Sequence, residues 1–140
     1  MSQRILFLII FFVTGVFCFL PGVSLAESGQ TNKNISGVVD FRQLEGRWVR
    51  PDGGYVLELR NIKRDGSAVA SYFNPRSIKV FSAKISRQDN HIILSVELRD
   101  VNYPGSIYNL IYDEVTDSLK GTYFQAVEKK TFNVEFIRMK

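Results

Sequence analysis

The sequence is poor in the residues on which most nucleophilic and metal chemistry depends. Its 140 residues include one cysteine, Cys18, and one histidine, His91. One cysteine provides neither an intramolecular disulfide nor a cysteine-based metal site. One histidine, beside the predicted turn at 88–90, excludes multi-histidine metal sites and argues against a histidine-dependent catalytic triad. We therefore expect no metal site and no cofactor.

Positive charge is not concentrated in any one segment. The chain has 18 lysines and arginines against 14 acidic residues, which gives a formal net charge of +4. The nearest approaches to a cluster, Lys63-Arg64 and Lys129-Lys130, lie at predicted hairpin ends. Because a nucleic-acid-binding surface needs a basic patch or stripe, we expect no binding to nucleic acid.

The carboxylates are dispersed in a way that does not suit acid–base catalysis. Glycoside hydrolysis needs two carboxylates in one cleft, but Glu58, Glu97 and Glu135 fall on the predicted outer face of the strands. Asp52 and Asp100 lie in separate predicted loops. The sequence also lacks a glycine-rich phosphate loop and a Gly-x-Ser-x-Gly nucleophile elbow. We therefore expect a protein that is not an enzyme.

The first 26 residues have the order of an export signal. Arg4 gives a positive start, residues 5–20 are apolar, and Ser24-Leu25-Ala26 carries the small residues that a signal peptidase reads. We expect cleavage after Ala26 and export to the periplasm or the medium, with no membrane span after cleavage. An uncleaved anchor is the alternative, because the apolar run is nearly long enough to span a bilayer.

The remaining chain divides into a short leader and one domain. Residues 27–40 are polar and rich in Ser, Asn, Gln and Gly, which predicts a flexible leader. Over residues 41–140, apolar and polar residues alternate with period two between turn-forming residues, as is typical of antiparallel strands. The predicted strands are 44–50, 54–62, 66–73, 78–87, 91–99, 106–114, 118–125 and 130–139.

The strand pattern predicts an all-β fold, an eight-stranded antiparallel up-and-down barrel that is closed to remove its edges. A two-sheet sandwich shows the same alternation and is the alternative. The predicted inward phase contains the bulky Phe81 and Phe132, and the interior of so small a barrel is either filled or holds one small ligand. It also contains five of the six tyrosines: Tyr55, Tyr72, Tyr108, Tyr112 and Tyr123.

Three residues at the two ends of this domain carry a family resemblance. Gly46-x-Trp48 opens the first predicted strand, and Arg138 lies in the inward phase of the last. This pattern resembles that of the lipocalins, within the calycin superfamily, and the chain is similar to small secreted bacterial lipocalin-like proteins. The resemblance implies that Arg138 packs across the indole of Trp48 at the closed end of the barrel.

The opposite end of the predicted barrel gathers the irregular links. The links at 51–53, 74–77, 100–105 and 126–129 share this rim, and they contain every proline outside the signal. We expect a ligand site here, with an arginine that binds a carboxylate or other anionic head through its guanidinium fork and tyrosines that flank the apolar part. The residues of this predicted site are Tyr72, Asn74, Arg76, Tyr103 and Tyr108.

Two functional hypotheses follow from this arrangement. The first is an exported, non-catalytic binding protein that holds a small apolar or amphipathic ligand at one rim of the barrel. The second is a protein-interaction module, such as an envelope adaptor or a periplasmic protease-inhibitor-like protein. Apolar residues in the predicted outer phase, including Ile111 and Phe124, favour a protein partner or a homodimer.

Overall fold

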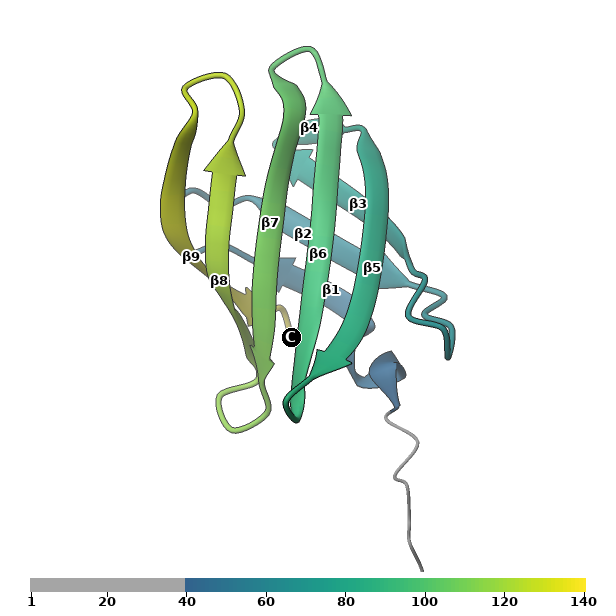
Figure 1. Ribbon diagram of the computed structural model, residues 1–140. Coiled ribbons are helices and arrows are strands. Elements are labelled where there is room, and N and C mark those ends of the chain that lie inside the picture. The colour runs from purple at the N-terminus through teal and green to yellow at the C-terminus, as the bar shows by residue number, and fades with distance from the viewer. Residues whose placement is uncertain (1–39) are drawn as a thin grey trace, which may run out of the picture. The chain divides into compact units, whose positions relative to one another are not determined.

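Nine antiparallel strands form a single up-and-down sheet that curves into a nearly closed barrel (Figure 1). The computed structural model describes residues 40–140, which belong to one compact unit. The predicted signal peptide and residues 27–39 of the predicted leader lie outside the described residues. The strands are β1 (Gly46–Val49), β2 (Val56–Arg60), β3 (Val69–Asn74), β4 (Arg76–Ile78), β5 (Val80–Gln88), β6 (His91–Asp100), β7 (Tyr103–Asp113), β8 (Ser118–Gln125) and β9 (Lys130–Arg138).

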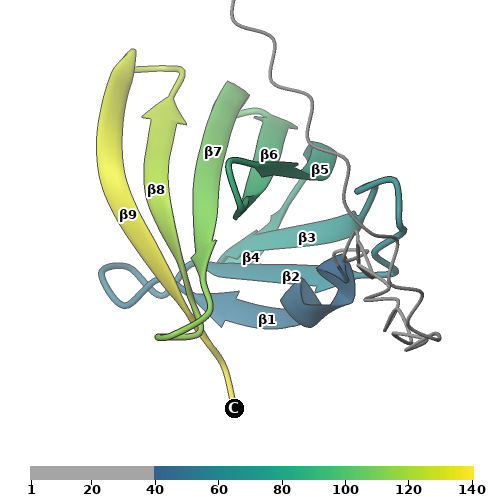
Figure 2. The same cartoon turned by 60° about the horizontal axis from the view of Figure 1, so that its bottom comes forward.

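The strand order explains the curvature of the sheet. It runs β4-β3-β2-β1-β9-β8-β7-β6-β5, so the first and last strands of the domain pair at the centre and the middle strands form the two edges. Figure 2 shows the β1–β3 part of the sheet facing the β5–β8 part across the interior. The predicted all-β antiparallel class is confirmed, with one continuous sheet of nine strands in place of eight.

The two edges of the sheet meet at one place. Ser67 and Lys84 form an isolated bridge, and the Ile85 amide donates a 2.7 Å hydrogen bond to the Gly66 carbonyl. Gly66 has a φ of +80°, and a Cβ there would lie 1.8 Å from the Ile85 carbonyl oxygen. Only glycine allows so close an approach of two backbones. The barrel is therefore closed by a short seam, not by a continuous ladder.

The additional strand, β4, lies in a segment that was predicted to be a link. Residues 74–77 do not form an open loop, because Asn74 pairs with Arg76 and the chain reverses at Pro75. The missing amide of proline is tolerated at this position because a turn residue has no ladder bond to give. The following residues pair back onto β3 and add β4 at the edge.

The prediction of a rim loop over 100–105 is also wrong. Strands β6 and β7 extend through it, with Arg99 opposite Pro104 and Asp100 opposite Tyr103, so that only Val101 and Asn102 connect the two strands. A shift of register beside Leu98 marks a bulge in this pair of strands. Such a bulge accommodates an extra residue while the ladder continues beyond it.

A second bulge turns Phe81 away from the predicted interior. The register shifts between Val80, which pairs with Leu98, and Ser82, which pairs with Glu97. The Phe81 side chain is consequently 52% exposed, and its ring is covered by the guanidinium of Arg99, 3.5 Å from the ring centroid. Period-two counting fails at this residue because a bulge reverses the face on which the side chain lies.

The core fills the barrel from its closed end up to buried tyrosines in the interior. The short 3-10 helix η1 (Phe41–Leu44) caps this end, where Leu44 is fully buried and its carbonyl accepts a 3.0 Å hydrogen bond from Trp48 Nε1. No helix among the described residues is long and apolar enough to cross a membrane. The fully buried large side chains are Trp48, Tyr72, Tyr108, Phe136, Leu44, Leu57, Leu59, Ile85, Leu94, Leu98, Leu110 and Leu119.

Candidate functional site

A cavity of about 340 Å³ lies at the opposite end of the barrel, where the β6–β7 and β8–β9 links stand at the top of Figure 1. Its walls come from β3, β7, β8 and β9 and from the β1–β2 and β6–β7 links. Six of the ten lining residues are aromatic and the other four are polar. It consists of Arg50, Tyr55, Tyr72, Asn74, Asn102, Tyr103, Tyr108, Tyr123, Gln125 and Phe132.

Three buried polar groups form a chain at the base of this cavity. The hydroxyls of Tyr72 and Tyr108 are 2.7 Å apart, and Arg50 Nη1 donates a 3.1 Å hydrogen bond to the Tyr108 hydroxyl. Tyr72 and Tyr108 are 1% and 0% exposed, and Arg50 is 8% exposed. The three side chains come from β3, β7 and the residue that follows β1, so the folded barrel alone brings them together.

One polar hydrogen of the Arg50–Tyr108–Tyr72 network has no acceptor among the described residues. Each phenol carries one O–H hydrogen, and the Tyr72–Tyr108 contact uses only one of the two. Arg50 is a donor only, so it cannot accept the other. No further acceptor for either hydroxyl is found among residues 40–140. One buried phenolic hydrogen is therefore available to an acceptor other than residues 40–140, such as an atom of a ligand.

Burial keeps both phenols protonated. Loss of hydration raises the pKa of Tyr108 to about 12, even though the hydrogen bonds from Tyr72 and Arg50 act in the opposite direction. The pKa of Tyr72 is raised further above its ordinary value, first by burial and then by its tyrosine neighbours. Both groups are neutral hydrogen-bond donors at physiological pH.

Aromatic rings form the side walls of the cavity. The rings of Tyr55 and Tyr72 are nearly parallel with centroids 6.4 Å apart, and those of Tyr108 and Tyr123 stack at 4.4 Å. The Arg50 guanidinium lies over the Tyr55 ring, 4.6 Å from its centroid. Stacked rings of this kind provide flat apolar surfaces and little conformational freedom.

Arg50 is held in place from the solvent side by Asp52. Nε donates to Oδ1 at 2.9 Å and Nη2 to Oδ2 at 2.5 Å, a two-point ion pair. Burial alone would lower the pKa of Arg50, but the hydrogen bonds to Asp52 and Tyr108 outweigh it and the pKa is raised. The same pair lowers the pKa of Asp52. The two residues therefore carry full and opposite charges.

The structure brings together four of the five residues predicted for the ligand site. Tyr72, Asn74, Tyr103 and Tyr108 line the cavity, and Asn74 Nδ2 donates a 2.6 Å hydrogen bond to the Tyr103 hydroxyl. The fifth, Arg76, is exposed on β4 and does not line the cavity.

The arginine of the cavity is Arg50, which sequence reasoning missed. Its position contained a signal, because Arg50 follows the buried Trp48 by two residues and so has the same inward phase. The predicted boundary of the first strand at residue 50 placed it at the edge of the rim loop, where an arginine is unremarkable.

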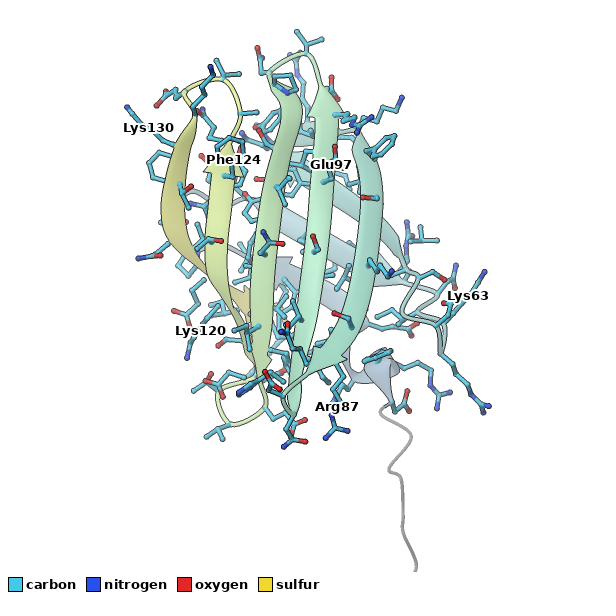
Figure 3. All side chains as sticks on the ribbon, viewed as in Figure 1. Lys63, Arg87, Glu97, Lys120, Phe124 and Lys130 are labelled. Atoms are coloured by element: carbon cyan, nitrogen blue, oxygen red, sulfur yellow. The ribbon has the colours of Figure 1, made fainter. Side chains whose placement is uncertain are left out.

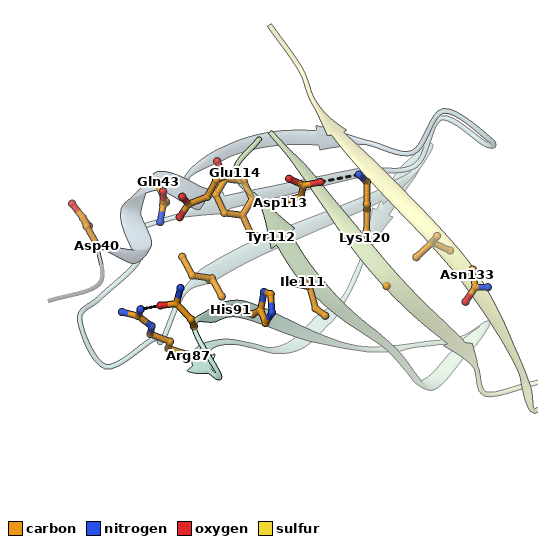
Figure 4. A pocket seen from close by; sticks show the side chains of 14 residues that line it. Asp40, Gln43, Arg87, His91, Ile111, Tyr112, Asp113, Glu114, Lys120 and Asn133 are labelled. Carbon is orange, nitrogen blue, oxygen red and sulfur yellow. Dashed lines mark hydrogen bonds and ion pairs between the residues drawn. The ribbon is translucent and has the colours of Figure 1, made fainter. Parts of the chain in front are cut away.

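A larger hollow of about 1040 Å³ lies at the other end, beside η1 and the β5–β6 and β7–β8 turns (Figure 4). Its lining includes the mainly buried Ile92 and Val134 but also the exposed Ile111 and Asn133, which lie on opposite faces of the sheet. A hollow with walls on both faces is not a single interior cavity. We assign no ligand site there, and His91, which lies beside it, is an exposed residue at the start of β6.

Compared with known proteins, the chain matches no family model, no curated protein and no solved structure at a significant level. The fold itself, a nearly closed antiparallel up-and-down barrel, is compatible with a lipocalin-like protein.

Proposed function

We propose that the chain is an exported, lipocalin-like binding protein that holds a small amphipathic molecule in the tyrosine-lined cavity. The observation that carries the proposal is the buried Tyr72–Tyr108–Arg50 chain, which has one phenolic hydrogen without a protein acceptor among the described residues. A buried polar hydrogen without an acceptor is costly, and a ligand with an acceptor oxygen would remove that cost.

The size and walls of the cavity suit a compact, partly aromatic ligand. A volume of about 340 Å³ lies near the lower end of the range for small-molecule pockets. The rings of Tyr55 and Tyr123, which line the cavity, offer flat surfaces against which a planar group can stack. The acceptor of the ligand would point to the buried hydroxyls, and its apolar part would lie between the rings.

The protonation states in the cavity support binding over catalysis. Tyr72 and Tyr108 stay protonated and Arg50 stays positive near neutral pH. The other residues that line the cavity are amides, a phenylalanine and further tyrosines. Within the described part of the chain, this lining offers no group poised to take a proton at neutral pH, which a general base must do.

Titration with 2-naphthamide, a planar probe with one carbonyl acceptor, tests this function. We expect chemical-shift changes in NMR spectra around Arg50, Asn74 and Tyr123, and an affinity at least about tenfold lower for Tyr108→Phe. Tyr112→Phe, which changes a phenol at the closed end of the barrel, is the matched control and should leave the affinity unchanged. Shifts confined to the turns at 63–66 and 115–118, or no binding at all, would reject the proposal.

The outer face of the sheet favours the interaction module as a second candidate function. An uncharged row of residues crosses β6 to β9 there, composed of Ser95, Asn109, Thr122 and Asn133. The exposed Ile111 and Phe124 flank this row, and Figure 3 shows Phe124 on the outer side of β8. Sedimentation velocity at increasing protein concentration tests for a homodimer, which Phe124→Glu should weaken if this face is the interface.

A further inference from the structure

We propose that Asp52 makes the cavity select ligands whose head is a neutral carbonyl over ligands that carry a carboxylate. This inference rests on the proposed binding function, and it replaces the anionic head that the sequence suggested. It follows from how the donors of Arg50 are shared between Asp52, Tyr108 and the cavity.

Asp52 occupies one full edge of the guanidinium. A guanidinium has five N–H groups, of which the Nε hydrogen and one Nη2 hydrogen go to Asp52 and one Nη1 hydrogen goes to Tyr108. One hydrogen on each terminal nitrogen is left. The side-on fork of Nε and Nη2, one of the two-point faces that bind carboxylates, is already used by Asp52.

The charge of Arg50 is already neutralised. Among the residues that line the cavity Arg50 is the one charged group, and Asp52 pairs with it at 2.5 Å. A ligand carboxylate on the remaining Arg50 donors would lie within a few ångströms of the Asp52 carboxylate, and like charges at that range repel strongly where water is scarce. It would also lose its own hydration. A neutral carbonyl accepts the same donors without either cost.

The turn between β1 and β2 fixes Asp52 in this position. The Arg50 amide donates to the Tyr55 carbonyl at 2.9 Å, and the Gly54 amide donates to the Arg50 carbonyl at 2.9 Å. This tight turn places Asp52 two residues after Arg50 with its side chain at the mouth, 59% exposed. Because its pKa is lowered by Arg50, Asp52 keeps its negative charge throughout the physiological range.

Calorimetric titration with two matched probes tests the inference. 2-Naphthamide and 2-naphthoate have the same ring system and differ in the charge of the head group. We expect the wild-type protein to bind the amide at least about tenfold more tightly than the acid. Asp52→Asn should raise the affinity for 2-naphthoate by about tenfold or more and change the affinity for 2-naphthamide by less than about threefold, because asparagine still accepts a hydrogen bond from Arg50.

Two further variants make the result decisive. Glu128→Gln removes a charge from the same rim at a residue that does not line the cavity, and it should keep the wild-type preference. Asp52→Ser provides a second test of the charge should the asparagine variant fold poorly. A wild-type preference for 2-naphthoate, or a preference that neither Asp52 variant changes, would overturn the inference while leaving the binding function intact. If neither probe binds any variant, the binding function fails and the inference fails with it.

Discussion

The guanidinium of Arg138 lies over the indole of Trp48, with its central carbon 4.0 Å from the ring centroid. The two residues are direct partners across β9 and β1, the last and first strands of the barrel. Arg138 also donates hydrogen bonds of 2.8 Å and 2.7 Å to the carbonyls of Glu45 and Gln43. The approach requires a glycine at position 46, where a Cβ would lie 2.9 Å from Nη1 of Arg138. One side chain thus joins both ends of the domain to the capping helix.

We expect the Trp48–Arg138 pair to be strongly coupled in stability. Trp48→Ala removes a fully buried aromatic and should lower the free energy of unfolding by about 3–5 kcal/mol. Arg138→Ala should cost about 1–3 kcal/mol, because it removes charge-assisted hydrogen bonds and the stacking contact. Urea denaturation of both single variants and the double variant measures the coupling. Additive losses would show that the stacking contributes nothing.

The barrel seam should depend on Gly66. Gly66→Ala places a methyl group against the Ile85 carbonyl and should destabilise the protein by about 2–4 kcal/mol, since both the backbone conformation and the inter-edge hydrogen bond are lost. Gly54→Ala is the control: its φ is also positive, but a Cβ there meets no atom within 4 Å. Its cost should be about 1 kcal/mol. Equal losses in the two variants would mean that the seam contact adds no stability.

Stability should fall at alkaline pH because of the buried phenols. The pKa of Tyr108 is raised to about 12 in the folded protein, against about 10 when unfolded. The resulting stability is present in full below pH 10 and is lost as the pH rises toward 12, with roughly 1 kcal/mol lost at pH 11 from Tyr108 alone. Urea denaturation between pH 8 and 11.5 measures the slope, which Tyr108→Phe should reduce. A slope equal in both proteins would place the ionising group elsewhere.

Export makes a prediction about the mature chain. If residues 1–26 are a cleaved signal, the protein isolated from its native envelope begins at Glu27. Intact-mass spectrometry of that material should show loss of these residues and of no others. A membrane-bound species that retains Met1 would identify the segment as an anchor.

The alternation of apolar and polar residues was sufficient to predict the class of the fold. Period two holds along β6, where Ile92, Leu94, Val96 and Leu98 are all buried, and it places the inward tyrosines correctly. It fails at the bulges, such as that beside Phe81, because a bulge depends on how two strands pair and leaves no trace in the period of either. The extra strand β4 escaped for a similar reason, since three residues are too short to show a period.

The candidate site could be predicted in part. Tyr72 and Tyr108 follow from strand phase, and Asn74 and Tyr103 from their place at the ends of strands that meet at one rim. Residue type alone did not separate Arg50 from Arg76, because both are arginines beside a proline at the same end, and the inward phase of Arg50 was hidden by the predicted end of the strand. What separates them is burial against Tyr55 and Tyr108, a property of the closed barrel.

The short seam gives the barrel a preferred line of opening. The edge strand β5 is joined to the opposite edge of the sheet by one bridge and one backbone hydrogen bond. To its neighbour β6, in contrast, it pairs from Val80 to Gln88. Separating the two edges therefore breaks far fewer hydrogen bonds than parting β5 from β6, and local openings of low cost are the most frequent ones in native proteins. We expect the interior to exchange with solvent first through this side wall, so that access to the core does not depend on the mouth alone.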